Sequence, residues 1–112
     1  MISKNLAAAS TKPIILALLS QGEDYGYQII QKVKTLSGGT LDWSDNMLYP
    51  VLRRLEETGL VVSRWRISAG ERLRKYYRIT ETGREELEAE RRQWSGLIRS
   101  LQLVWDPLLG RE

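Results

Sequence analysis

The chain has 112 residues, 42% of them apolar, and a net charge of +3, values that suit one globular domain and exclude a disordered protein. It contains no cysteine and no histidine, which excludes a disulfide framework and a thiol nucleophile and argues against an enzyme, a metal site or a cofactor site. No apolar run approaches the ~20 residues that cross a bilayer, and the N-terminus has no signal-peptide pattern, so we expect a cytoplasmic protein without a membrane partner.

The first half of the sequence predicts helices. The first covers residues 5–21, where Pro13 lies either in the first turn of a helix that starts near Thr11 or after a short arm. The second covers residues 25–36, with two acidic side chains beside its positive end. Residues 41–43 are predicted to form a connector, and a short strand is the alternative for this segment.

Ser44 is predicted to cap a third helix by accepting a hydrogen bond from a backbone N–H of the first turn. Pro50 is expected to distort the second turn, and Thr58 and Gly59 to end the helix. The apolar face of this helix consists of Leu48, Val51, Leu52 and Leu55. Short helices joined by glycine-containing connections indicate a helix-turn-helix, whose recognition helix would be the third.

The hydrophobic period then changes to that of a β-hairpin, or wing. Residues 61–67 and 74–80 are predicted strands, and Ala69 and Gly70 form the turn between them. Residues 61–84 hold seven basic and two acidic side chains, a local net charge of +5. Such a patch is typical of a protein that binds a polyanion, and the alternative is a solvated arginine-rich hairpin without a partner.

Thr80 is predicted to cap a last helix that runs from about Glu81 toward Trp105. Apolar residues recur along it every seven positions, which indicates a packing seam on a long helix. The expected homodimer interface consists of Leu87, Trp94, Leu97, Leu101, Trp105 and Leu108.

These elements together predict a mainly α-helical protein with a small β-hairpin. Its architecture is a winged helix-turn-helix followed by a long C-terminal dimerisation helix. We expect the winged DNA-binding domain to cover residues 1–80, and the dimerisation helix and tail to cover residues 81–112.

Several motifs resemble those of the PadR-type winged-helix transcriptional regulators. They are Tyr-Gly-Tyr at residues 25–27, Leu-Tyr-Pro at 48–50 and Arg-Lys-Tyr-Tyr at 74–77, and with their flanks they cover roughly residues 10–95. The single C-terminal helix is similar to the compact branch of that family. The resemblance implies a dimeric repressor, of a kind that often releases DNA when a small molecule binds. Family members often carry Gly-Thr where this chain has Asn46 and Met47. The resemblance therefore does not imply that this chain binds the operator sequence of another family member.

Two groups of side chains are predicted to contact double-stranded DNA. The recognition helix would read the major groove, and the wing would contact phosphates or the minor groove. The first group is Ser44, Asn46, Tyr49 and Arg53; the second is Arg72, Arg74 and Lys75. The alternative for the first group is that Ser44 only caps, Asn46 is solvated and Arg53 pairs with Glu56 or Glu57.

Trp94 and Trp105 are candidates for contact with a small apolar or aromatic effector, because the resemblance implies an aromatic-lined cavity at the dimer interface. The alternative for both is plain packing. Of the tyrosines at 25, 27, 76 and 77, two or three are expected to be core residues. The rival function is a winged-helix ligand-sensing or protein-interaction module that does not bind an operator.

Overall fold

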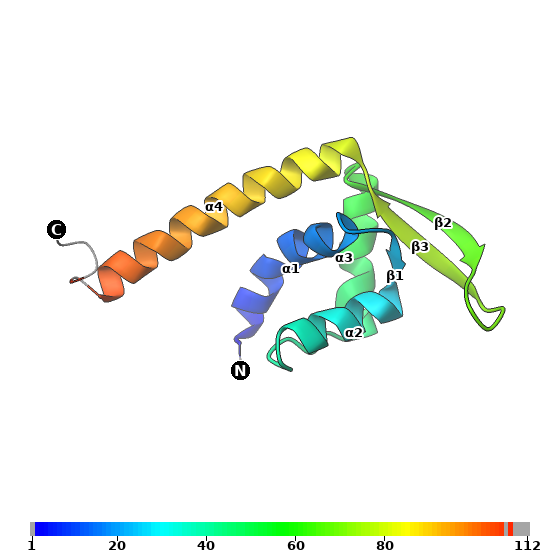
Figure 1. The fold of residues 1–112 in the computed structure, drawn as a ribbon, viewed down its shortest axis with the longest axis horizontal. Helices are drawn as coiled ribbons and strands as arrows, with labels where there is room; N and C mark the ends of the chain where they lie inside the picture. Colours follow the sequence, from blue (N-terminus) through cyan, green and yellow to red (C-terminus); the bar gives the residue numbers. More distant parts are fainter. Residues whose placement is uncertain (1, 107, 109–112) are drawn as a thin grey trace.

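The computed structural model describes residues 2–106 and residue 108. Its elements in chain order are α1 (Lys4–Leu19), β1 (Asp24–Tyr25), α2 (Gly26–Leu36), α3 (Asp45–Glu57), β2 (Val61–Ile67), β3 (Leu73–Ile79) and α4 (Glu81–Trp105). Helices α1–α3, strand β1 and the root of the hairpin β2–β3 form a body from which the rest of the hairpin and the long α4 extend (Figure 1). The predicted mainly helical winged helix-turn-helix with a long C-terminal helix is confirmed. Residues 107 and 109–112 of the expected C-terminal unit lie outside the described residues.

Helix α1 runs without interruption through Pro13, so both alternatives that the sequence suggested for this proline are wrong. The helix begins after Ser3, whose hydroxyl accepts a hydrogen bond from the Leu6 backbone N–H at 3.3 Å. Pro13 removes one helical hydrogen bond. Packing on both sides of the proline offsets this loss, because Thr11 and Ile15 are buried against the rest of the body.

The sheet has a third strand that the sequence did not predict. Strand β1 is two residues long and pairs with β3, so that Asp24 lies opposite Tyr77 and Tyr25 opposite Tyr76, and the strand order is β1-β3-β2. The alternative of a strand at residues 41–43 is wrong, because Trp43 is buried in the core and the segment pairs with no strand.

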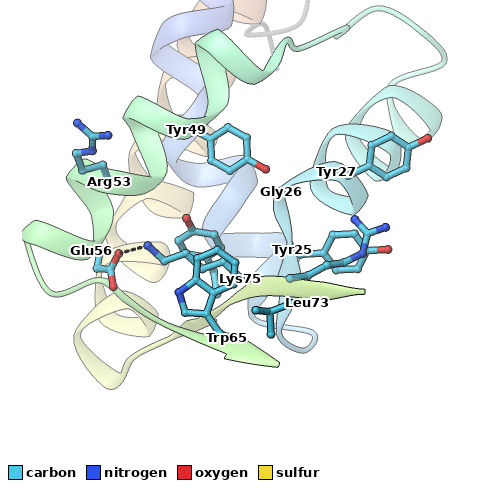
Figure 2. Close-up of a pocket in the computed structure, with 11 residues that line it drawn as sticks. Tyr25, Gly26, Tyr27, Tyr49, Arg53, Glu56, Trp65, Leu73 and Lys75 are labelled. Carbon is cyan, nitrogen blue, oxygen red and sulfur yellow. Dashed lines mark ion pairs between the residues drawn. The ribbon is translucent and has the colours of Figure 1, made fainter. Parts of the chain in front are cut away.

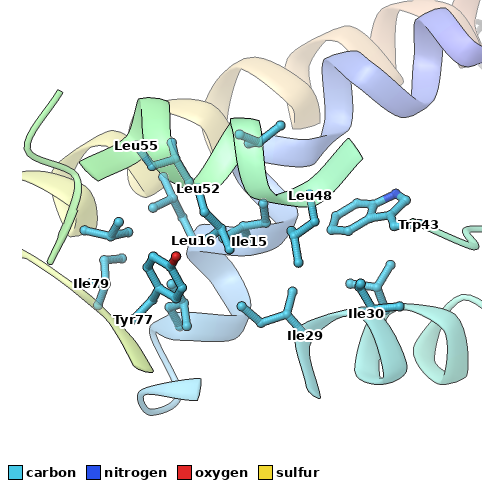
Figure 3. Close-up of a cluster of buried hydrophobic side chains, with 14 of the residues drawn as sticks. Ile15, Leu16, Ile29, Ile30, Trp43, Leu48, Leu52, Leu55, Tyr77 and Ile79 are labelled. Atoms are coloured by element: carbon cyan, nitrogen blue, oxygen red, sulfur yellow. The ribbon is translucent and has the colours of Figure 1, made fainter. Parts of the chain in front are cut away.

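The core lies between α1, α2, α3 and the root of the wing (Figure 3). Leu48, Leu52 and Leu55 of α3 contribute the face that the sequence predicted. Tyr76 and Tyr77 are buried, which agrees with the expectation that two or three of the four tyrosines pack. Leu87 of α4 also belongs to this core and is only 5% exposed.

The first turn of α4 is fixed to the connection between α3 and the wing. Thr80 caps the helix as predicted, with its hydroxyl accepting from the Gly83 N–H at 3.0 Å, and the Thr80 N–H donates to the Leu60 carbonyl at 3.0 Å. A Cβ at Gly83 would overlap the Leu60 carbonyl oxygen. Glycine therefore allows α4 to begin in direct contact with the body, and this contact sets the direction in which the helix leaves.

Candidate nucleic-acid interface

The recognition helix α3 presents an exposed N-terminus. The Ser44 hydroxyl accepts from the Met47 N–H at 3.2 Å, which confirms the predicted cap, and α3 continues through Pro50 to Glu57. Ser44, Asn46 and Tyr49 are exposed, whereas Met47 packs partly against the core. Because residues three or four positions apart share a helix face, Asn46 and Tyr49 lie on one side of α3.

A cleft of about 530 Å³ separates α3 from the wing (Figure 2). One wall carries Tyr49 and Arg53 of α3, the other carries Trp65 and Lys75 of the hairpin, and the start of α2 closes one end. The cleft therefore brings together two of the four recognition-helix residues predicted from sequence with Arg74 and Lys75 of the wing. Asn46 and Arg72 lie outside it, nearer the N-terminus of α3 and the wing turn respectively.

The Tyr-Gly-Tyr and Leu-Tyr-Pro motifs meet at one contact. A Cβ at Gly26 would overlap the hydroxyl of Tyr49, so glycine allows the Tyr49 ring to lie over the first turn of α2. Burial raises the pKa of the Tyr49 phenol, and the negative charge of Asp45 adds to this effect. The phenol therefore stays protonated near neutral pH and can donate a hydrogen bond.

Part of the wing's positive charge is balanced from within the chain. The Glu23 carboxylate, in the loop before β1, accepts hydrogen bonds from Arg64, at 2.9 Å, and from Arg66. The hydrogen bond from Arg64 holds the pKa of Glu23 below its ordinary value. The sequence did not indicate this pairing, because Glu23 is distant from both arginines along the chain and is brought to the wing by β1.

Three other arginines, Arg53 of α3 and Arg72 and Arg74 of the wing, have no ion-pair partner in the described part of the chain. Among the described residues Arg53 pairs with neither Glu56 nor Glu57. The Glu56 carboxylate instead accepts from the Ser63 hydroxyl at 2.5 Å and lies 3.9 Å from the Lys75 ammonium. Within the same part of the chain, Arg72 and Arg74 have no carboxylate partner.

Aromatic stacking stiffens the outer face of the wing. The guanidinium of Arg66 lies 4.2 Å from the Tyr76 ring centroid, and that of Arg74 lies 4.3 Å from the Tyr25 centroid. The two rings contact each other edge to face, with centroids 5.2 Å apart. Cation–π and aromatic contacts of this kind contribute roughly 0.5–1 kcal/mol each at exposed sites. They fix Arg74 at the rim of the cleft.

The apolar seam predicted on α4 divides into two parts. Leu87 is buried in the core, so it packs within the chain and is not available to a second copy. The seam beyond it is open in the single chain, and its most exposed members are Trp105 and Leu108, which are 74% and 71% exposed. Leu97 is exposed as well, and Trp94 and Leu101 are partly exposed.

A polar network holds Trp94 and the middle of α4 on α1. The Trp94 Nε1–H donates to Glu90 at 3.2 Å, and the Lys12 ammonium lies 2.5 Å from Glu86 and 3.4 Å from Glu90. The hydrogen bond to Glu86 raises the pKa of Lys12, against the opposing effect of burial. Trp94 borders a hollow of about 370 Å³ beside α1, whereas Trp105 lies at the far end of the helix.

The described part of the chain contains neither a membrane-spanning helix nor a cluster of acidic side chains that could bind a metal ion. None of its helices has the length and apolar character needed to cross a membrane. Nor do the described residues contain a group of three or more acidic side chains placed to hold a metal ion.

A helix-turn-helix followed by a β-hairpin defines a winged-helix protein. The basic cleft between the recognition helix and the hairpin lies on the side with which such proteins bind nucleic acid. Residues 15–89 match the sequence model of the transcriptional regulator PadR-like family, and the chain belongs to this family.

Three related proteins illustrate the similarity. The chain is 33% identical over 76 residues to the negative transcriptional regulator PadR of Bacillus subtilis, an alignment that covers 68% of this chain and 42% of that protein. A transcriptional regulator from Clostridium thermocellum superposes with a TM-score of 0.83 at 26% identity, covering 91% of this chain and 96% of that one. The structure of Bacillus subtilis PadR in complex with operator DNA superposes with a TM-score of 0.62 at 32% identity, covering 70% of this chain and 43% of that one.

Proposed function

We propose that this PadR-family regulator is a homodimeric, sequence-specific repressor that binds double-stranded DNA. The observation that carries the proposal is the cleft between α3 and the wing, where Arg53 of the recognition helix lies across from Arg74 and Lys75 of the wing. The similarity to a regulator whose structure contains operator DNA supports the same conclusion.

The recognition helix supplies base contacts, and the wing supplies phosphate contacts. Asn46 is placed to pair with adenine, and Arg53 to bind guanine or phosphate, as these side chains do in major grooves. The hydroxyl groups of Ser44 and Tyr49 donate hydrogen bonds to phosphate oxygens of the neighbouring DNA backbone. Arg72, Arg74 and Lys75 neutralise phosphates, which contributes affinity that depends on salt but not on sequence.

The dimer forms through residues 81–112, and residues 1–80 form the DNA-binding unit. The support is the seam of Trp94, Leu97, Leu101, Trp105 and Leu108, whose members are exposed or partly exposed on α4 and just beyond its end. A two-fold dimer would place its recognition helices about 34–36 Å apart, or a multiple of this distance, and would bind a pseudo-palindromic site.

An apolar or aromatic effector would bind near the two-fold axis, where Trp94, and less directly Trp105, offer rings for stacking. It would release DNA by favouring a dimer with wrongly spaced recognition helices, an effect of about 1–3 kcal/mol in typical allosteric proteins. Replacing Trp94 by alanine should then abolish ligand affinity, and unchanged affinity would place the effector site elsewhere.

Genomic fragments captured by the purified protein and sequenced provide the direct test of function. The selected site should be bound more tightly than random DNA, and replacing Asn46 by alanine should relax preference at one base pair in each half-site. Replacing Arg72, Arg74 and Lys75 by alanine should weaken all sequences alike and flatten the dependence on salt.

A matched control removes the same charge elsewhere, by replacing Lys4, Arg92 and Arg99, which are exposed on α1 and α4. This variant should retain most of the affinity. The competing function, a ligand-sensing or protein-interaction module, would be indicated if no fragment is enriched and binding to DNA does not fall steeply with salt.

A further inference from the structure

The inner face of the wing, which is turned toward α3, stays apolar beyond the end of the core. Side chains alternate between the two faces of a strand, and at the wing's root Val61 and Tyr77 point inward and are buried. Nearer the turn, the same face carries Trp65, Ile67 and Leu73, which are 63%, 68% and 63% exposed. We call these three residues the wing-tip cluster.

The wing-tip cluster shares its face with positive charge. Trp65 is the direct cross-strand partner of Lys75, and Ile67 that of Leu73. Trp65, Leu73 and Lys75 line the cleft opposite Arg53 (Figure 2). Large apolar side chains that gather on a surface mark a binding site, and the cations beside them restrict what can bind.

A purely apolar partner would strip water from Arg53 and Lys75 without supplying a counter-charge, which is costly. A DNA strand satisfies both kinds of side chain, because apolar deoxyribose rings alternate with phosphates along it. Tyr49 lines the cleft and lies on the same side of α3 as Asn46, so a strand that borders the major groove at α3 would pass between α3 and the wing.

We infer that Trp65 and Leu73 form a platform for the deoxyribose rings of one DNA strand in this cleft, while its phosphates lie against Arg53 and Lys75. The indole Nε1–H of Trp65 is a donor only and therefore suits a phosphate oxygen. Lys75 turns to the phosphate from Glu56, 3.9 Å away. This inference rests on the proposed DNA-binding function. It adds non-ionic contacts with DNA, which the distribution of charged residues does not indicate.

The test measures the affinity for a fluorescent random-sequence duplex over a range of salt concentrations. Trp65→Ala should bind about tenfold more weakly, a loss in the lower part of the range for aromatic side chains that stack on bases, because here the indole packs on sugar rings. Its salt slope should equal that of the wild type, since no charge is lost, whereas Lys75→Ala should reduce the slope by about 1. Val62→Ala, an exposed residue on the outer face of the same strand, should behave as wild type.

Two results in this series would overturn the platform and leave the DNA-binding function intact: unchanged affinity of Trp65→Ala, or a reduced salt slope. The wild type's own affinity tests the proposed function separately, and a wild type that fails to bind the duplex removes both. If Trp65→Ala instead changes the sedimentation of the protein, the cluster binds a second copy of the chain and the inference is wrong.

A second measurement does not depend on affinity. The chain has four tryptophans, so protein labelled with 5-fluorotryptophan gives a small set of fluorine resonances, in which Trp65→Phe assigns the signal of Trp65. Saturation with the duplex should shift this signal more than that of the buried Trp43. A Trp65 signal that does not move would overturn the platform.

Discussion

Replacing Gly83 by alanine should destabilise the protein although alanine is the better helix former. The new Cβ would overlap the Leu60 carbonyl oxygen and lie 2.7 Å from Cγ1 of Ile79. The carbonyl belongs to a backbone segment that accepts hydrogen bonds from the Thr80 backbone N–H at 3.0 Å and from the Thr80 hydroxyl at 3.1 Å, so it cannot yield without breaking them.

The expected size follows from two opposing effects. Alanine gains up to about 1 kcal/mol of helix propensity over glycine, less in a first turn. Overpacking against a well-packed neighbour costs about 1–3 kcal/mol. The net loss should therefore be about 1–2 kcal/mol, which lowers the melting temperature by several degrees in a domain of this size.

Gly96 provides the matched control, because it lies on the same helix and a Cβ there meets nothing within 4 Å. Gly96→Ala should raise stability by about 1 kcal/mol. Both variants are measured by thermal and urea unfolding at one protein concentration, since association shifts apparent stability. If Gly83→Ala is as stable as Gly96→Ala, α4 does not approach Leu60 as described.

Other contacts give further predictions. Glu23→Gln should free Arg64 and Arg66 and steepen the salt dependence of DNA binding; an unchanged slope would contradict the pairing. Because its folded pKa is lowered, Glu23 stabilises the protein above the ordinary value of 4.5 and loses this effect as the pH falls below it, so the melting temperatures of wild type and Glu23→Gln should converge in acid. The raised pKa of Lys12 implies a stabilising effect at the other end of the pH range. Lys12→Met should have a lower melting temperature than wild type up to about pH 10.5, the ordinary pKa of lysine, and the difference should disappear above it. A difference in melting temperature that persisted well above that pH would argue against the ion pair with Glu86. Glu71 has a left-handed backbone, with φ of 61°, so Glu71→Gly should stabilise the wing by about 1 kcal/mol in thermal unfolding, and a loss of stability would refute the strain.

Features that depend on neighbouring residues could be predicted from the sequence. The caps at Ser44 and Thr80, the hairpin and the extent of α4 follow from hydrogen bonding and side-chain periodicity within each segment. Strand β1 could not be predicted, because two residues carry no pattern and their strand character comes from pairing with β3.

The same limit applies to the candidate site. The cations of the wing were visible in the sequence, but their partner Glu23 was not, since folding alone brings them together. Leu87 illustrates a different ambiguity. Its heptad spacing continues into Trp94 and Leu101, and spacing defines a helix face without saying which neighbour covers it; the body covers Leu87 and leaves the later positions open.

Helix α4 is fixed to the body along its first half, by the Gly83–Leu60 contact, by the buried Leu87 and by the ion pairs of Lys12, and its second half extends beyond these contacts. The segment from Trp94 to Trp105 is about 16 Å long, so a tilt of about 10° of α4 on the body would displace the far end of this segment by about 3 Å. In the proposed dimer, the spacing between the two recognition helices would therefore depend on a few degrees in how the first half of α4 lies on the body. A change too small to disturb the core could then decide which spacing of half-sites the protein fits.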